Sequence, residues 1–113
     1  MKIGIIGASF ARDAYLPAMA HIPGAEVVAI ASGRLSSARD CADRFGVPHA
    51  YDDWQLMLDS HDLDLVCIAT PTALHGPQTL AALARGAHVL CEKPMAMNAT
   101  EARAMLEAAT AAG

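Results

Sequence analysis

The sequence predicts an α/β fold in which a parallel sheet carries helices on both faces. Short apolar runs typical of strands alternate with helix-like segments along the whole chain. Two of these runs, residues 26–31 and 63–69, are apolar almost throughout, as strands covered on both faces are. Because crossovers between parallel strands are right-handed, the alternation predicts a doubly wound parallel sheet of five strands in the order 3-2-1-4-5.

Length and composition limit the classes of protein that fit. A chain of 113 residues, 54% hydrophobic and 18% charged, supports one globular domain, residues 1–113. The formal charge of −4 argues against a nucleic-acid surface, and no apolar run approaches the length of a membrane span. Cys41, Cys67 and Cys91 lack metal-site spacing, so we expect buried reduced thiols, no metal and a cytoplasmic location.

The first strand and the turn after it organise the chain. An apolar run that includes Ile5 and Ile6 ends at Gly7, and Ala8 and Ser9 lead into a helix that we expect to end or bend near Pro17. Gly7 permits a sharp turn, and the free N–H groups of the following helix can receive a phosphate. The same residues also suit a structural turn that binds nothing.

The next elements are a strand at 26–31, a helix, and a short strand at 47–51. Ser36 or Ser37 is expected to cap the helix, and Gly46 is expected to end it. Four residues at helical spacing form its predicted buried face: Ala38, Cys41, Ala42 and Phe45. A further helix is expected around residues 54–58.

The second half repeats the pattern with strands at 63–69 and 88–91. Pro77 suits the first turn of the intervening helix, which is expected to run to Arg85 and stop at Gly86. Asn98 and Glu101 form a capping-box arrangement at the start of the last helix. Its predicted buried face is Ala102, Met105, Leu106 and Ala109.

Candidate binding residues follow the predicted strands. In dinucleotide-binding folds, a carboxylate after the second strand binds the adenosine ribose of NAD, and an arginine there accommodates the 2′-phosphate of NADP. Here Ser32, Gly33 and Arg34 follow that strand and no carboxylate does, which favours NADP, with NAD also possible. The alternative is that Arg34 is an ordinary solvated loop residue.

The fourth and fifth strands are also followed by polar residues. Thr70, Pro71 and His75 come just after the fourth strand, where ligands bind in open α/β sheets. Glu92 and Lys93 come just after the fifth. Lys93 is a candidate general acid or base if its surroundings lower its pKa toward neutrality.

Four segments together resemble one family: GASFARDAYLPA, AIASGR, DLVCIATPTALH and HVLCEKPMAM. They are similar, over essentially the whole chain, to the N-terminal Rossmann domain of the Gfo/Idh/MocA oxidoreductases, such as glucose–fructose oxidoreductase and inositol dehydrogenase. The resemblance implies hydride transfer between NAD(P) and a carbon of a sugar, cyclitol or related polyol. It implies that Lys93 lies at the nicotinamide and relays the proton of the substrate hydroxyl. The cofactor-binding set that we expect is Gly7, Ala8, Ser9, Phe10, Ser32, Arg34, Ala69, Thr70, Pro71, His75, Glu92 and Lys93.

The chain departs from the family pattern in several places. Ser9 and Arg12 stand where the glycine-rich turn has glycine and a small residue, so either Ala11 packs in that place or Arg12 turns outward toward phosphate. Ala87 stands where many members have lysine. The family's sixth strand and second domain do not follow residue 113, so we expect a fragment, a truncated form or a split gene product. We also expect a homo-oligomer. Alternatives are a non-catalytic dinucleotide-binding or regulatory module, or a half-protein that needs a partner chain.

Overall fold

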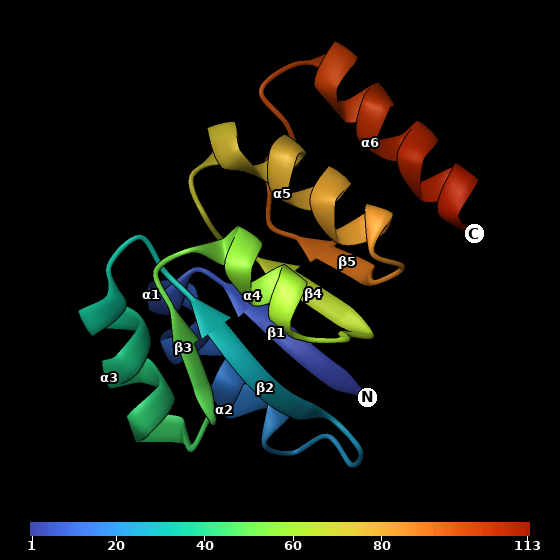
Figure 1. Ribbon diagram of the computed structural model, residues 1–113. Coiled ribbons are helices and arrows are strands. Elements are labelled where there is room, and N and C mark those ends of the chain that lie inside the picture. The colour runs from blue at the N-terminus through green and yellow to red at the C-terminus, as the bar shows by residue number, and fades with distance from the viewer.

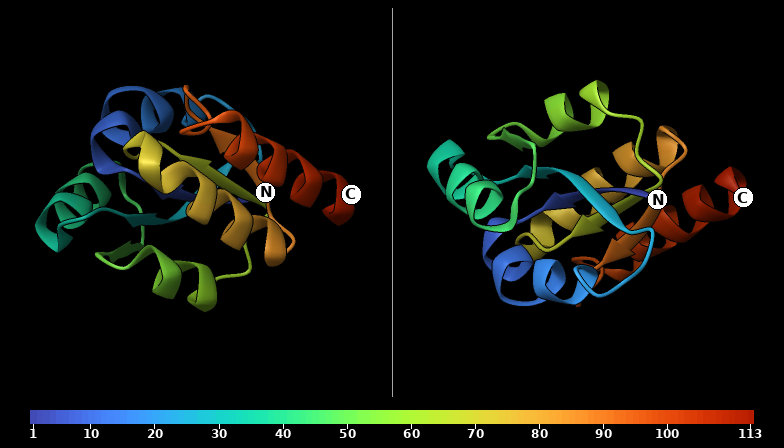
Figure 2. Two further views of the ribbon diagram at one scale, coloured as in Figure 1. Left: turned by 90° about the horizontal axis from the view of Figure 1, so that it is seen from above. Right: turned by 90° about the horizontal axis from the view of Figure 1, so that it is seen from below.

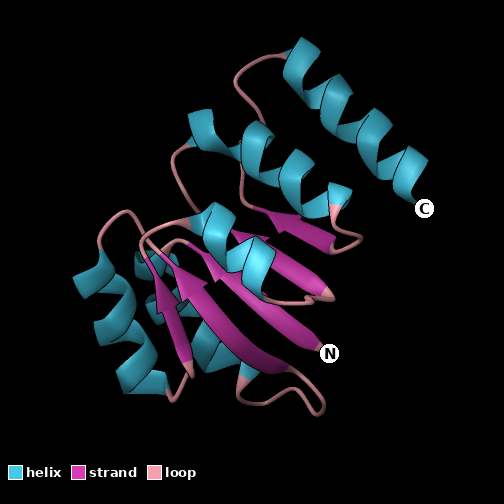
Figure 3. Cartoon of the chain, in the orientation of Figure 1, coloured by secondary structure: helices cyan, strands magenta, loops and turns pink.

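A computed structural model describes all residues, 1–113, and contains one parallel sheet of five strands in the order β3-β2-β1-β4-β5. The arrowheads of all the strands point the same way in Figure 3. The strands are β1 (Lys2–Ile6), β2 (Glu26–Ala31), β3 (His49–Tyr51), β4 (Leu65–Ile68) and β5 (His88–Cys91) (Figure 1). The predicted fold and strand order are therefore confirmed, and the third and fourth strands are shorter than predicted.

Helices cover both faces of this sheet, as the two views in Figure 2 show. The helical segments are α1 (Ala8–Phe10), η1 (Ala11–Tyr15), α2 (Leu16–Met19), α3 (Leu35–Phe45), α4 (Trp54–Ser60), α5 (Thr72–Ala84) and α6 (Ala99–Ala112). Residues of the segments from α1 to α3 pack in one apolar cluster with Ile5 and Ile30, and residues of α4 and α5 pack in a second with Val66 and Ile68. None of the helices combines the length and apolar character that crossing a membrane requires.

The strand register brings the carboxyl ends of four strands to one edge. Ile6 pairs with Ala31 on one side and with Ile68 on the other, and Ile68 pairs with Cys91. Backbone bonds continue one residue further: Gly7 N–H donates to Ala31 O at 2.8 Å and Ala69 N–H donates to Ile6 O at 2.8 Å. The residues that follow these strands therefore begin from one line across the sheet.

The first helical segment passes through Pro17 and ends two residues later, close to where the sequence predicts it to end or bend. Helical structure runs from Ala8 to Met19, with a π turn over Ala11–Tyr15 directly before α2. Proline has no N–H to donate and its ring crowds the carbonyl four residues earlier. The wider π turn falls on the stretch that must accommodate this defect.

Two predicted helix starts were wrong. Helix α5 begins at Thr72 with Pro71 as its N-cap, so Pro77 lies inside the helix, where it is exposed. Helix α3 begins at Leu35 after Arg34, so neither Ser36 nor Ser37 caps it. In both cases a loop of three residues separates the strand from the helix, and the helix begins before the residue that propensity favours.

The other helix ends follow local chemistry more closely. Asp53 caps α4 by accepting hydrogen bonds from Gln55 N and Leu56 N at 2.9 and 3.2 Å. Asn98 caps α6 by accepting from Glu101 N at 2.9 Å, and Glu101 Oε1 accepts from Met97 N at 3.1 Å, as a variant of the predicted capping box. Gly46, with φ 69°, ends α3 as predicted.

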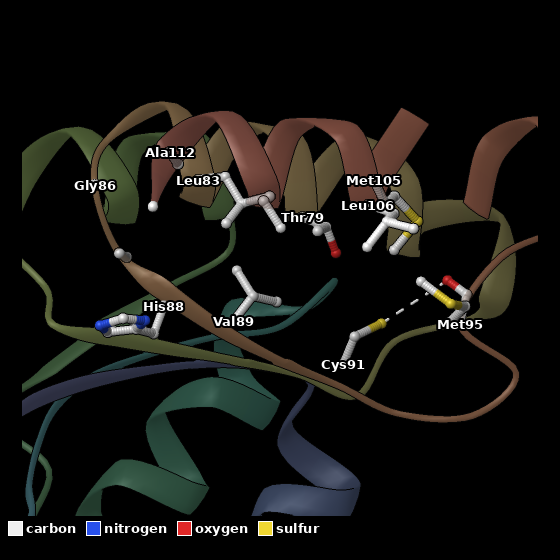
Figure 4. A pocket seen from close by; sticks show the side chains of 13 residues that line it. Thr79, Leu83, Gly86, His88, Val89, Cys91, Met95, Met105, Leu106 and Ala112 are labelled. Atoms are coloured by element: carbon white, nitrogen blue, oxygen red, sulfur yellow. Dashed lines mark hydrogen bonds between the residues drawn. The ribbon is translucent and has the colours of Figure 1, made fainter. Parts of the chain in front are cut away.

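The predicted buried face of α6 is only partly buried. Met105 is buried, whereas Leu106 is 64% exposed. Helix α6 packs on α5, and a hollow of about 460 Å³ lies between these helices and β5. Figure 4 shows Leu83 of α5, Val89 of β5 and Met105 and Leu106 of α6 around it. This face is therefore an apolar surface beside an edge strand.

The three cysteines are free thiols, as expected, but they are not equally buried. Cys41 and Cys67 are buried, and burial raises the pKa of the Cys67 thiol to about 12. Cys91 is half-buried, lines the hollow beside β5 and donates a weak hydrogen bond to Met95 O at 3.9 Å (Figure 4).

The exposed edge of β5 predicts association of the 113-residue chain. An unpaired strand edge beside apolar side chains is a template for pairing with another chain. We expect dimers or larger species whose fraction rises with concentration in sedimentation equilibrium. Leu90, which is exposed on β5, is the place to test this, because Leu90→Lys adds a charge to the edge and should weaken association. A monomer at high concentration, with cooperative unfolding, would contradict the prediction.

Candidate functional site

A groove of about 360 Å³ lies at the carboxyl edge of the sheet. It lies where the chain changes direction across the sheet, since β1 leads outward to β2 and the return connection from β3 enters β4. Such crevices are where open α/β sheets bind their ligands. The residues that line it are Ile6, Gly7, Ala8, Ser9, Ser32, Gly33, Trp54, Ala69, Thr70, Pro71, Leu74 and Gln78.

Gly7 forms the floor of the groove and cannot carry a side chain there. Its φ is 118°, a region that L residues rarely adopt, and a Cβ at this position would collide with the carbonyl oxygen of Ala69. The backbones that follow β1 and β4 therefore approach as closely as they do only because residue 7 is glycine.

Of the two alternatives for the altered turn, the helical segment after Gly7 supports the packing of Ala11, and it pairs Arg12 with Asp13. Ala11 is 0% exposed and packs in the apolar cluster under α3. Arg12 points outward and donates from Nε to Asp13 Oδ1 at 2.7 Å. The small residue needed for close packing is thus Ala11, and Ser9 lies exposed at the mouth of the groove.

The part of the groove that follows β2 contains Ser32 and Gly33, and no carboxylate lines the groove. Arg34 follows them as the exposed N-cap residue of α3 and does not line the groove. Phe10 is also outside the lining and packs edge-on against Tyr15, with ring centroids 5.1 Å apart.

The opposite wall contains a polar pair, Thr70 and Gln78, of which sequence reasoning predicted Thr70 and missed Gln78. Thr70 Oγ1 donates to Gln78 Oε1 at 2.6 Å, and Gln78 is only 1% exposed. The Gln78 amide nitrogen has no hydrogen-bond partner, although buried amides usually have one. Trp54 and Leu74 were missed as well. A predicted helix start at Thr72 would have placed Leu74 and Gln78 one turn apart on the same helix face. The preference of proline for the first helical turn led instead to a predicted start near Pro77.

His75 lies beneath the groove and not in its wall. It is 1% exposed, its Nε2 is 2.7 Å from Thr70 O, and its Nδ1 is 2.9 Å from Pro94 O. The ring therefore ties the end of β4 to the loop that follows β5. This loop contains Lys93.

A second contact holds the same loop from the other side. Tyr15 Oη donates to Glu92 Oε1 at 2.7 Å. Burial first, and then this hydrogen bond, raise the pKa of Tyr15 above its ordinary value. Lys93 itself is exposed and belongs to neither ion pair of the structure. The lysine is thus free between two anchored neighbours.

The structure therefore brings together only part of the predicted set. Those that line the groove are Gly7, Ala8, Ser9, Ser32, Ala69, Thr70 and Pro71. Those that do not are Phe10, Arg34, His75, Glu92 and Lys93. No group of three His, Cys, Asp or Glu side chains is placed to hold a metal ion.

These features fit a dinucleotide. Gly7 allows β1 to turn sharply into a helical segment, and the first N–H groups of such a segment, which have no intrahelical partner, suit a pyrophosphate. The opposite wall adds the buried pair of Thr70 and Gln78. The fold and the groove define a nucleotide-binding Rossmann domain.

The chain belongs to the Gfo/Idh/MocA family, described as an oxidoreductase family with an NAD-binding Rossmann fold, whose model matches residues 1–113. It is 37% identical over 113 residues to scyllo-inositol 2-dehydrogenase (NADP(+)) of Bacillus subtilis, covering 100% of this chain and 34% of the relative. It is 36% identical over 114 residues to D-glucoside 3-dehydrogenase of Escherichia coli, covering 100% and 32%. The chain thus spans about a third of the length of these relatives.

Solved structures agree with this assignment. A 3-ketoreductase from Actinomadura kijaniata in complex with NADP matches with a TM-score of 0.90 and 33% identity, over 98% of this chain and 36% of that one. An oxidoreductase from Agrobacterium radiobacter in complex with NAD+, L-tartaric acid and magnesium matches with a TM-score of 0.93 and 27% identity, over 99% and 33%. NAD(P) is therefore the cofactor of this family.

The contact between Gly7 and Ala69 predicts the outcome of one substitution. Gly7→Ala combines a disfavoured φ with a backbone collision and should lower the free energy of unfolding by about 3 kcal/mol or more. Urea unfolding measures this loss.

The matched control is Gly24→Ala, because Gly24 also has a positive φ, 81°, but nothing within 4 Å of the added Cβ. That substitution should cost only about 1–2 kcal/mol. Equal losses in the two variants would show that the groove floor relaxes around an added methyl group.

Proposed function

We propose that residues 1–113 form the cofactor domain of an NADP-preferring oxidoreductase that acts on a sugar, cyclitol or related polyol. The observation that carries this proposal is the groove at the sheet edge, beside a lysine loop that two side chains anchor. The relatives support it, since they are named as dehydrogenases and reductases of inositol, glucosides and sugar derivatives.

Different residues in and near the groove would bind different parts of the cofactor. The N–H groups that follow Gly7 would receive the pyrophosphate, because they lie free at the start of a helical segment. Ser32 and Arg34 would hold the adenosine ribose and its 2′-phosphate. Ala69, Thr70 and Pro71 would border the nicotinamide side, and Phe10 and His75 would act by packing and by hydrogen bonding beneath it.

Lys93 would supply the acid–base chemistry. When bound, the nicotinamide accepts a hydride from the carbon of a secondary alcohol or returns it to a carbonyl. The hydroxyl proton released in oxidation would pass to the neutral amine of Lys93 and would be given back in reduction. Glu92 and His75 would fix the loop so that the lysine stays at this edge.

We also propose a cellular location and partners for the whole protein. The three free thiols fit a reducing compartment, which favours the cytoplasm. The partner would be a small-molecule substrate, without nucleic acid or membrane, and the whole protein would be a homo-oligomer.

Cofactor preference is the first test. We expect the chain to bind NADPH more tightly than NADH, because no carboxylate meets the ribose and Arg34 is available for the phosphate. A charge-assisted contact is worth about 1.5–3 kcal/mol, so Arg34→Ala should remove roughly tenfold or more of the preference. Calorimetry with both cofactors measures it. Equal affinities of the unmodified chain for NADPH and NADH would contradict the preference for NADP.

A test of the role of Lys93 requires a protein that turns over substrate. The isolated chain should bind NADPH weakly without oxidising polyols, because nothing positions a substrate. Joined to the part of the Bacillus subtilis relative that it does not match, it should gain activity. Lys93→Met should then lower kcat by about 10²–10⁴-fold while changing cofactor affinity much less.

Lys2→Met is the matched control, because Lys2 is the other lysine of the chain and lies at the opposite end of β1. This variant should keep normal turnover. Near-normal turnover of Lys93→Met would reduce Lys93 to a cofactor contact.

A further inference from the structure

A second hollow, of about 280 Å³, lies between the first helical segment and α3. Its lining is Ala8, Ser9, Arg12, Ser37, Asp40, Cys41 and Arg44. Ala8 and Ser9 also line the groove at the carboxyl edge of the sheet. The two hollows therefore meet at the turn that follows β1.

The charges in this hollow suit an anion. Arg12 and Arg44 are both exposed and outnumber the one lining carboxylate, that of Asp40. Arg12 uses its guanidinium for Asp13, donating from Nε at 2.7 Å and from Nη2 at 3.1 Å. The side chain of Asp13 is 63% exposed, so water can solvate it once it is released. The cation is thus held by a partner that is easily exchanged.

Ser9 and Ser37 line the same hollow, and each carries a hydroxyl that could donate to an anion. Ser9 is in the first helical turn after Gly7, and Ser37 is in the first turn of α3, directly after the Ser32–Arg34 loop. In dinucleotide-binding folds the adenosine ribose lies at the end of the second strand, which here is the position of Ser32. A phosphate on the ribose 2′-oxygen would therefore stand near the place where groove and hollow meet.

We propose that this hollow receives the 2′-phosphate of NADP and that Arg12 exchanges Asp13 for that phosphate, with Ser9 and Ser37 as hydroxyl donors. The proposal rests on the proposed cofactor function and adds a second cation to Arg34. The guanidinium fork binds a phosphate bidentately, and a phosphate monoester carries more negative charge than a carboxylate. Arg12, which breaks the glycine-rich pattern, thereby becomes a specificity residue.

The test compares NADPH and NADH binding to the 113-residue chain at low salt. Arg12→Ala should weaken NADPH about tenfold and leave NADH unchanged, because only NADPH carries the phosphate. Asp13→Asn should act in the opposite direction and tighten NADPH by roughly two- to fivefold, because it removes the competing carboxylate. Arg39→Ala is the matched control, since Arg39 is exposed on α3 outside the hollow and should change neither affinity.

Adenosine 2′,5′-bisphosphate and adenosine 5′-monophosphate provide a second measurement that isolates the phosphate. Arg12→Ala should weaken only the bisphosphate. Equal weakening of both nucleotides, or of NADPH and NADH alike, would overturn the inference, because Arg12 would then serve the turn itself. An Arg12→Ala variant that keeps the full NADPH preference, while Arg34→Ala loses it, would overturn the inference as well and leave the proposed function intact. Failure of the unmodified chain to bind either dinucleotide would overturn the proposed function together with the inference.

Discussion

The close approach of the backbones after β1 and β4 is the constraint on which the site depends. Gly7 N–H bonds to Ala31 O, Ala69 N–H bonds to Ile6 O, and a Cβ at Gly7 would collide with the Ala69 carbonyl. These contacts join three strands at the point where the sheet ends. They also place the start of the next helical segment, whose first N–H groups have no intrahelical partner, at the groove. The packing of the strands therefore sets the shape of the groove, and the loop residues add only the side chains that line it.

The loop after β5 depends on a different device, which is polar and partly buried. His75 contacts the carbonyl oxygens of Thr70 and Pro94, and Tyr15 donates to Glu92. The partners come from η1, from the end of β4 and from α5, so packing of both helical layers is needed to fix the loop. A lysine on such a loop is held in place by its neighbours and needs no salt bridge of its own.

Much of the fold could be predicted because its signals are local and strong. Apolar runs predicted the strand bounds 26–31 and 88–91 correctly. Gly46 marked the end of α3 through its backbone conformation, and Asn98 marked the start of α6 through its side-chain hydrogen bond. The failures fall at helix starts and on α6. Pro77 suits a first turn but lies inside α5, and Leu106 has a buried spacing but is exposed. Propensity ranks local preferences, and the packing of a helix on its strand can override them.

The sequence by itself determined the family, the strand order and the groove residues that directly follow strands, namely Gly7, Ser32 and Ala69 to Pro71. Position after a strand is readable from one segment at a time, and parallel strands bring such positions to one edge. Only the tertiary structure decided that His75 is a buried strut, that Gln78 stands in the groove wall and that Ala11 packs where Arg12 cannot. Each of these roles depends on what a distant segment places opposite the side chain, and a linear pattern does not contain that information.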